Sequence, residues 1–144
     1  MQNLSQIIFS IALSAMATAA IGQSRPIPPR SELDATMNNM VREFNSKMSG
    51  TSVDEQTKIK LMTYDAATPT LGYLYSTRHF AKTGKRTIDA EYARTLRSFH
   101  VEKTCSSNFK ALMKNYGLEI VHSFADENTG KNLIEIRVKP TDCN

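Results

Sequence analysis

Hydrophobic residues in the first half of the chain follow the period of an amphipathic helix. Between positions 31 and 50 they recur at steps of three and four residues and therefore share one helical face. The stripe consists of Leu33, Met37, Met40, Val41, Phe44 and Met48. Its width is that of an ordinary buried face, so we expect this helix to pack on a sheet. The alternative is a methionine-rich groove that binds peptides, since methionine adapts to varied partners.

A second pattern, the alternation of apolar and polar residues, predicts two β-hairpins. The predicted strands are residues 58–64, 71–77, 118–124 and 133–139. A turn at 66–70 joins the first pair, and a polar loop at 126–131 joins the second pair. Each pair is therefore expected to be antiparallel.

Helical spacing returns between the two hairpins, over residues 87–116. Its first apolar positions are Ile88, Tyr92, Leu96 and Phe99. The pattern is interrupted at residues 104–107 and ends before Gly117, which predicts two helices or one with a sharp bend. The order of elements, α-β-β-α-α-β-β, predicts an α+β fold. We expect an antiparallel four-stranded sheet made from two hairpins, with helices packed on one face.

The N-terminus has the pattern of a secretory signal. An apolar stretch at 7–17 is followed by small residues up to Gly22, and no Lys or Arg precedes it. We expect a signal peptide at 1–22, a Pro-rich flexible leader at 23–30 and a single domain at 31–144. A short membrane anchor or a buried N-terminal helix is the alternative. No later run has the length of a membrane span, so a periplasmic or secreted protein without a transmembrane segment is predicted.

Export changes the interpretation of the two cysteines. In an oxidising compartment an even number of cysteines favours disulfide bonding, and two cysteines allow one pairing. We therefore predict a disulfide between Cys105 and Cys143. It would connect the helical junction to the end of the chain.

Charge and motifs narrow the possible functions. The net charge of +4 is spread along the 144 residues, whereas nucleic-acid-binding proteins usually concentrate positive charge, so no nucleic-acid partner is expected. There is no phosphate-binding loop, nucleophile elbow or metalloprotease helix. The three histidines, His79, His100 and His122, have no metal-ligand spacing, and a disulfide would remove the thiolate that a Cys–His pair needs. Neither a metal, a cofactor nor a catalytic residue is predicted.

Two groups of residues are candidates for binding. A cationic patch comes from the segment before the second helical region and from that region's first turns: Arg78, His79, Lys82, Lys85, Arg86, Arg94 and Arg97. If segment and helix face the same way, the patch suits an acidic protein or a phosphate-bearing surface; a solvated loop is the alternative. Tyr73 and Tyr75 share one strand face and either line a recognition surface or pack in the core.

Several short motifs resemble those of a group of small, uncharacterised exported proteins of Gram-negative bacteria. The motifs are Val53-Asp54-Glu55-Gln56-Thr57, Leu71-Gly72-Tyr73-Leu74-Tyr75, Cys105, Tyr116-Gly117-Leu118 and Cys143. The resemblance covers most of the chain after the signal and implies export and one disulfide. Because the group has no assigned activity, it implies no catalytic residue.

A small exported domain without a catalytic motif is best interpreted as a binding protein. We expect an accessory, inhibitor or immunity-type factor that acts through protein–protein contact. Its partner is expected to be a protein, and the cationic patch favours an acidic one. The alternative is an exported hydrolase whose site is assembled only by folding.

Overall fold

The computed structural model describes residues 26–78 and 88–144, which form four helical elements and four strands. In chain order these are α2 (Arg30–Met48), β1 (Thr57–Asp65), β2 (Thr70–Thr77), α3 (Ala90–Cys105), α4 (Phe109–Tyr116), β3 (Glu119–Asp126), β4 (Asn132–Val138) and the 3-10 helix η1 (Pro140–Cys143). The expected order of elements and the α+β class are confirmed.

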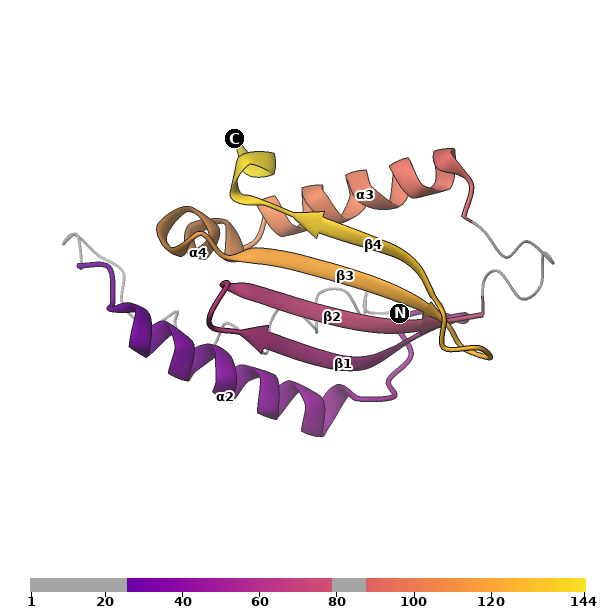
Figure 1. Cartoon of the computed structure of the whole chain (residues 1–144), viewed down its shortest axis with the longest axis horizontal. Coiled ribbons are helices and arrows are strands. Elements are labelled where there is room, and N and C mark those ends of the chain that lie inside the picture. The colour runs from indigo at the N-terminus through magenta and orange to yellow at the C-terminus, as the bar shows by residue number, and fades with distance from the viewer. Residues whose placement is uncertain (1–25, 79–87) are drawn as a thin grey trace.

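The strands form one sheet in the order β1-β2-β3-β4 (Figure 1). The outer pairs, β1 with β2 and β3 with β4, are antiparallel hairpins as predicted. The central pair is parallel, with Leu71 opposite Ile120, Tyr73 opposite His122 and Tyr75 opposite Phe124. The prediction of a purely antiparallel sheet is therefore wrong, and the sheet is mixed.

The physical reason lies in the connection between the hairpins. Two parallel neighbours need a crossover of a dozen or more residues, usually helical, because the chain must return to the end where the first strand began. The segment between Thr77 and Glu119 contains both α3 and α4 and makes this return. The sequence showed the helices, but the alternation within each strand is the same in parallel and antiparallel neighbours.

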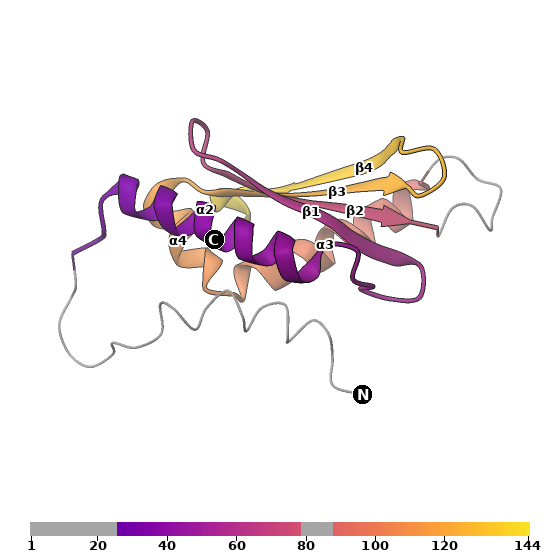
Figure 2. The same cartoon turned by 90° about the horizontal axis from the view of Figure 1, so that it is seen from below.

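The helices lie on one face of the sheet, as Figure 2 shows. Helix α2 packs on β1, and α3 packs on β4. The core between the layers contains Leu33, Met37, Phe44, Ile59, Met62, Leu71, Phe109, Met113, Leu118, Ile120, Ile136 and Val138. The stripe expected on the first helix is thus committed to the core, with Met40, Val41 and Met48 packed against its border.

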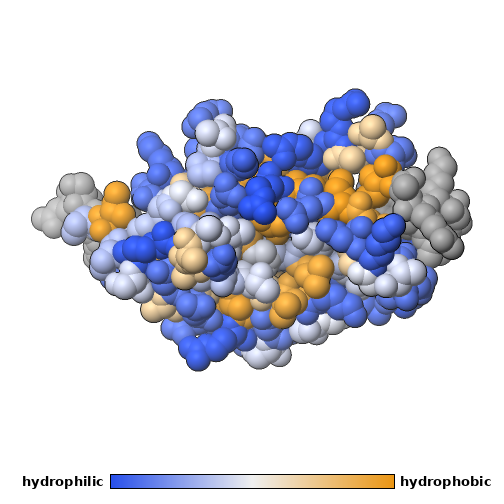
Figure 3. Space-filling view, viewed as in Figure 1, coloured by the Kyte–Doolittle hydropathy of each residue, from blue (hydrophilic) through white to orange (hydrophobic). Residues whose placement is uncertain are grey.

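The opposite face of the sheet carries no helix among the described residues. It mixes hydrophilic and hydrophobic side chains (Figure 3). Leu61 and Leu74, which pair across β1 and β2, are 42% and 37% exposed there. Such scattered apolar side chains are normal on a protein surface.

A disulfide and a pair of hydrogen bonds attach the helices α3 and α2 to the rest of the domain. Cys105, the last residue of α3, forms the predicted disulfide with Cys143 of η1, with their Cα atoms 5.1 Å apart. At the other side of the sheet, the Asn45 amide donates to the Met62 carbonyl at 2.8 Å and accepts from the Met62 N–H at 2.7 Å. Asn45 thereby satisfies part of the free edge of β1. The disulfide thus cross-links α3 to the segment that follows β4, and Asn45 holds α2 against β1.

Candidate binding groove

A groove runs between α2 and α3 on the helical side of the sheet. Because α2 lies over β1 and α3 over β4, the central strands are left between the two helices (Figure 1). The groove encloses a cavity of about 360 Å³. Its lining is mainly apolar and aromatic and comes from α2, β1, β2, β3, β4, α3 and α4.

Helix α3 contributes a long stripe to the groove: Tyr92, Leu96, Phe99, His100, Lys103 and Thr104. These positions recur at three- and four-residue steps, so they form one face of the helix. The stripe extends over about 18 Å, since a helix rises about 1.5 Å per residue. Of the whole helix only Thr104 is buried, and Phe99 is 47% exposed. An ordinary surface helix buries its apolar stripe, and α3 does so only in part.

The floor of the groove is a stack of aromatic rings from the two parallel strands. The ring of Tyr75 lies 4.6 Å from Phe124, and the ring of Tyr73 lies 5.2 Å from His122, each pair nearly parallel. Phe44 of α2 packs edge-on against Tyr73 at 6.0 Å. The parallel register of β2 and β3 creates this stack, because it places these residues opposite one another. Burial raises the pKa of both tyrosines, so their hydroxyls stay neutral.

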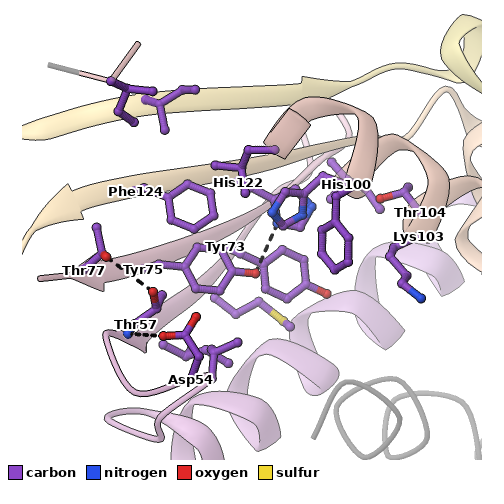
Figure 4. Close-up of a pocket in the computed structure, with 18 of the residues that line it drawn as sticks. Asp54, Thr57, Tyr73, Tyr75, Thr77, His100, Lys103, Thr104, His122 and Phe124 are labelled. Carbon is purple, nitrogen blue, oxygen red and sulfur yellow. Dashed lines mark hydrogen bonds between the residues drawn. The ribbon is translucent and has the colours of Figure 1, made fainter. Parts of the chain in front are cut away.

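Two histidines lie one over the other in the wall of the groove (Figure 4). His122 projects from β3 and His100 from α3, and their ring centroids are 4.0 Å apart. The Tyr75 hydroxyl lies 3.2 Å from His122 Nδ1. Burial lowers the pKa of His100 to about 4, and burial together with the neighbouring His100 lowers the pKa of His122. Both rings are therefore uncharged at neutral pH.

Among the residues that the structure describes, two charged side chains line the groove, Asp54 and Lys103. The Lys103 ammonium is 5.8 Å from the centroid of the Phe99 ring, a cation–π distance. The Asp54 carboxylate accepts hydrogen bonds from the backbone N–H groups of Gln56 and Thr57, both at 2.7 Å. The interior of the groove is thus apolar and aromatic, with two neutral histidines as its central polar groups.

The predicted binding residues fall into different places. Tyr73 and Tyr75 line the groove on the helical side of the sheet. Arg78 is exposed and pairs with Glu127, and Arg97 donates to the Arg137 carbonyl at 2.9 Å and to Asp142 at 3.0 Å.

The remaining members of the cationic patch are Arg94 and four residues of the segment before α3. Arg94 is exposed on α3. Lys82, Lys85 and Arg86, together with His79, lie outside the described residues. The cationic patch therefore stays a prediction.

Sequence reasoning did not identify His100 and His122 as parts of a binding site. It tested them as metal ligands or catalytic partners, and no cluster of three or more His, Cys, Asp or Glu suited to a metal occurs within residues 26–78 and 88–144. Both lie on apolar faces, where His122 is buried and His100 is partly buried. The helical stripe that ends at Phe99 was a partial indication of the groove. The spacing of its residues does not show whether another element covers the stripe.

Comparison with known proteins identifies the fold. No family model matches the chain, and no curated protein matches it. A crystal structure of a Pseudomonas aeruginosa protein described as secreted is similar, with 16% identity over 83% of this chain and 100% of that chain and a TM-score of 0.64. The pilotin of the Vibrio vulnificus type 2 secretion system is also similar, with 14% identity over 80% of this chain and 94% of that chain and a TM-score of 0.60. At these identities the likeness establishes a shared fold.

The structure also bears on membrane insertion. Across residues 26–78 and 88–144, no helix combines the length and the apolar character needed to span a bilayer.

Proposed function

We propose that this chain is a small exported accessory protein that binds a helical segment of a partner protein in the groove between α2 and α3. The observation that carries the proposal is the incompletely buried stripe of α3, with Phe99 47% exposed beside the cavity. Covering this stripe would remove apolar surface from water, which is the main driving force of protein association. An amphipathic helix in a hydrophobic groove is a common way to achieve this.

The length of the stripe on α3 is the feature of the groove that suits a helix. The part of the lining that α3 supplies is about 18 Å long, which corresponds to about 12 residues of helix at a rise of about 1.5 Å per residue. A helix on the same sheet, beside α2 and α3, would pack its side chains between theirs as neighbouring helices do. The partner segment should therefore present an apolar face with helical spacing.

The shared fold supports an accessory role outside the cytoplasm. One neighbour is described as secreted, and the other is a pilotin of a secretion system. Export through a cleaved signal at 1–22 agrees with a disulfide in the folded domain. Cell fractionation tests this part of the proposal. When the full chain is expressed, the protein recovered from the periplasm or the medium should lack residues 1–22. Recovery of the uncleaved chain from the cytoplasm would contradict it.

A photo-crosslinking experiment tests the groove itself. A photoreactive phenylalanine analogue replaces Phe99 in the exported protein, and a matched variant carries it in place of Leu74 on the open face of the sheet. These two positions are similarly exposed, at 47% and 37%. Both proteins are irradiated in cell-envelope extract of the producing organism, and the crosslinked peptides are sequenced by mass spectrometry.

The expected result is a crosslink from position 99 to one recurring segment of one protein, with apolar residues at helical spacing. Position 74 should not capture this segment. Equal capture at both positions, or scattered segments from abundant proteins at position 99, would contradict binding in the groove. The hydrolase alternative has a separate test, since turnover of broad hydrolase substrates by the same protein, abolished by His100→Ala, would identify the groove as a catalytic site.

A further inference from the structure

The histidine pair places a buried hydrogen-bonding group in a mainly apolar groove. His122 is only 7% exposed, and its Nε2 atom has no hydrogen-bond partner among the residues that the structure describes. A buried polar atom without a partner is unusual, because leaving it unpaired costs about 1–3 kcal/mol. The groove therefore contains an unmet hydrogen-bonding group.

The other ring nitrogen indicates what kind of group Nε2 requires. The Tyr75 hydroxyl lies 3.2 Å from Nδ1. A phenol donates a hydrogen bond more readily than it accepts one. We therefore assign Tyr75 as the donor to Nδ1, which places the proton of the neutral ring on Nε2. Nε2 is then a donor that requires an acceptor. Tyr75 acts as a positioning residue by fixing this tautomer.

His100 forms the layer between His122 and the open part of the groove. Its ring lies 4.0 Å from that of His122 and 5.3 Å from that of Phe99, which is 47% exposed. His100 is itself only partly buried, so an occupant of the groove can touch it directly. His122 Nε2 is buried beneath this layer, so a group that pairs with it requires the His100 side chain to move aside.

We propose that the partner helix carries one uncharged hydrogen-bond acceptor, a carboxamide or a hydroxyl, in the middle of its apolar face, and that this group pairs with His122 and His100. The inference rests on the proposed function and specifies its partner. The pair thus acts as a specificity element that rejects a wholly apolar helix by leaving the histidines unpaired.

The site favours an uncharged acceptor over a carboxylate. Its walls are aromatic and apolar, and burying a carboxylate there would cost far more than burying an amide. The nearest described cation at the border, Lys103, is engaged with the Phe99 ring. A carboxamide or hydroxyl meets the requirement of Nε2 without introducing a charge.

Selection from a peptide library tests the inference. The probe is a displayed library of amphipathic helices about 14 residues long, enough to cover the groove at about 1.5 Å per residue. Positions on the apolar face vary among Leu, Ile, Phe, Asn, Gln, Ser, Thr, Asp and Glu. The exported wild-type protein, His122→Phe, His122→Gln and His100→Phe are used as baits, after thermal unfolding has shown which of them are folded.

The wild type should enrich peptides with a single Asn, Gln, Ser or Thr at one fixed position of an apolar face. His122→Phe and His100→Phe should enrich wholly apolar faces, whereas His122→Gln, which keeps a polar group near the position of Nε2, should retain the wild-type preference. If His122→Phe does not fold, the partly exposed His100→Phe serves for the comparison. Synthetic peptides that differ only by Asn or Leu at the selected position should differ about tenfold in Kd for the wild type.

Three results would overturn the inference. Enrichment of Asp or Glu would show that the site takes a charged acceptor. Identical peptide compositions for all baits would show that the histidines do not influence which peptides bind. In both cases the groove still binds helices and the proposed function stands. Failure of the wild type to enrich any peptide would remove the proposed function, and with it this inference. Self-association of the wild type through the groove would give the same result and would be seen as a dimer by light scattering.

Discussion

His100 and His122 make the stability of the domain depend on pH. Burial lowers the pKa of His100 from 6.5 to about 4, and the pKa of His122 is also lowered. Between pH 6.5 and about 4, the unfolded chain therefore binds protons that the folded chain does not. Stability is then highest above the unfolded pKa and is lost as the pH falls through this window. Each histidine contributes a slope of at most about 1.4 kcal/mol per pH unit.

We predict that the free energy of unfolding of the wild type falls as the pH is lowered from 6.5 to about 4. Urea unfolding at a series of pH values measures this change. Asp34 and Glu127, whose pKa values are also lowered by their partners, lose their contributions at still lower pH, near and below about 4. The loss of stability caused by protonation of His100 therefore occurs at higher pH than the loss caused by protonation of the two carboxylates.

His100→Phe provides the control for this prediction. It removes one titrating group and keeps an aromatic ring in the wall of the groove, so the slope between pH 6.5 and 4 should decrease. A slope that is unchanged in His100→Phe and also in His122→Phe would show that other groups, such as His79, cause the pH dependence.

The sequence predicted which residues share a strand face, but not which faces of different strands lie side by side. Alternation places Tyr73 and Tyr75 on one strand face, and this face does line the groove. The same alternation also places His122 and Phe124 on one face, but it does not show that this face lies beside the tyrosines. That proximity depends on the register between β2 and β3, which residues far apart in the sequence determine.

At the level of elements, the regular patterns were sufficient for the helices and hairpins. The stripe from Leu33 to Met48, the two hairpins and the interruption after residue 104 all correspond to elements of the structure. The parallel pairing of β2 with β3 was missed, because a helical connection can return the chain to either end of a sheet. The groove was missed for the same reason, since it lies above this pair of strands.

The disulfide joins the end of α3 to η1. Cys105 ends α3, and Cys143 lies in η1, 38 residues later. We predict that Cys143→Ser lowers the free energy of unfolding by about 4 kcal/mol, because the cross-link reduces the conformational entropy of the unfolded chain. Denaturant unfolding of the oxidised wild type and the variant measures the difference.

Cys105→Ser and the chemically reduced wild type are the controls for this prediction. The free energy of unfolding should fall by a similar amount in Cys143→Ser, Cys105→Ser and the reduced wild type, since each lacks the same cross-link. If reduction of the wild type has no effect while Cys143→Ser is destabilising, the loss comes from packing, because Cys143 is buried with its sulfur 4.0 Å from that of Met113.

At the scale of the whole molecule, the predicted cationic patch is close in sequence to the α3 wall of the groove. The patch comes from residues 78–89, which connect β2 to α3, and from the first turns of α3. Two of its described arginines already have acidic partners, Arg78 with Glu127 and Arg97 with Asp142. The long-range attraction predicted for this cationic patch can be tested at Lys82, Lys85 and Arg86, which lie outside the described residues.

We predict that reversing Lys82, Lys85 and Arg86 to Glu slows association with an acidic partner and leaves folding intact. Charged residues near a binding site mainly change the association rate, and salt screens this effect. The association rate with the partner captured at position 99 is measured by stopped-flow fluorescence at low and high ionic strength. A matched variant reverses Lys110, Lys114 and Lys139, which are exposed on and near α4 and η1, and changes the net charge equally. At low salt the first variant should associate more slowly than the second, and at high salt the two association rates should converge. Equal association rates at all salt concentrations would show that the patch is only solvated and that the apolar groove alone determines binding.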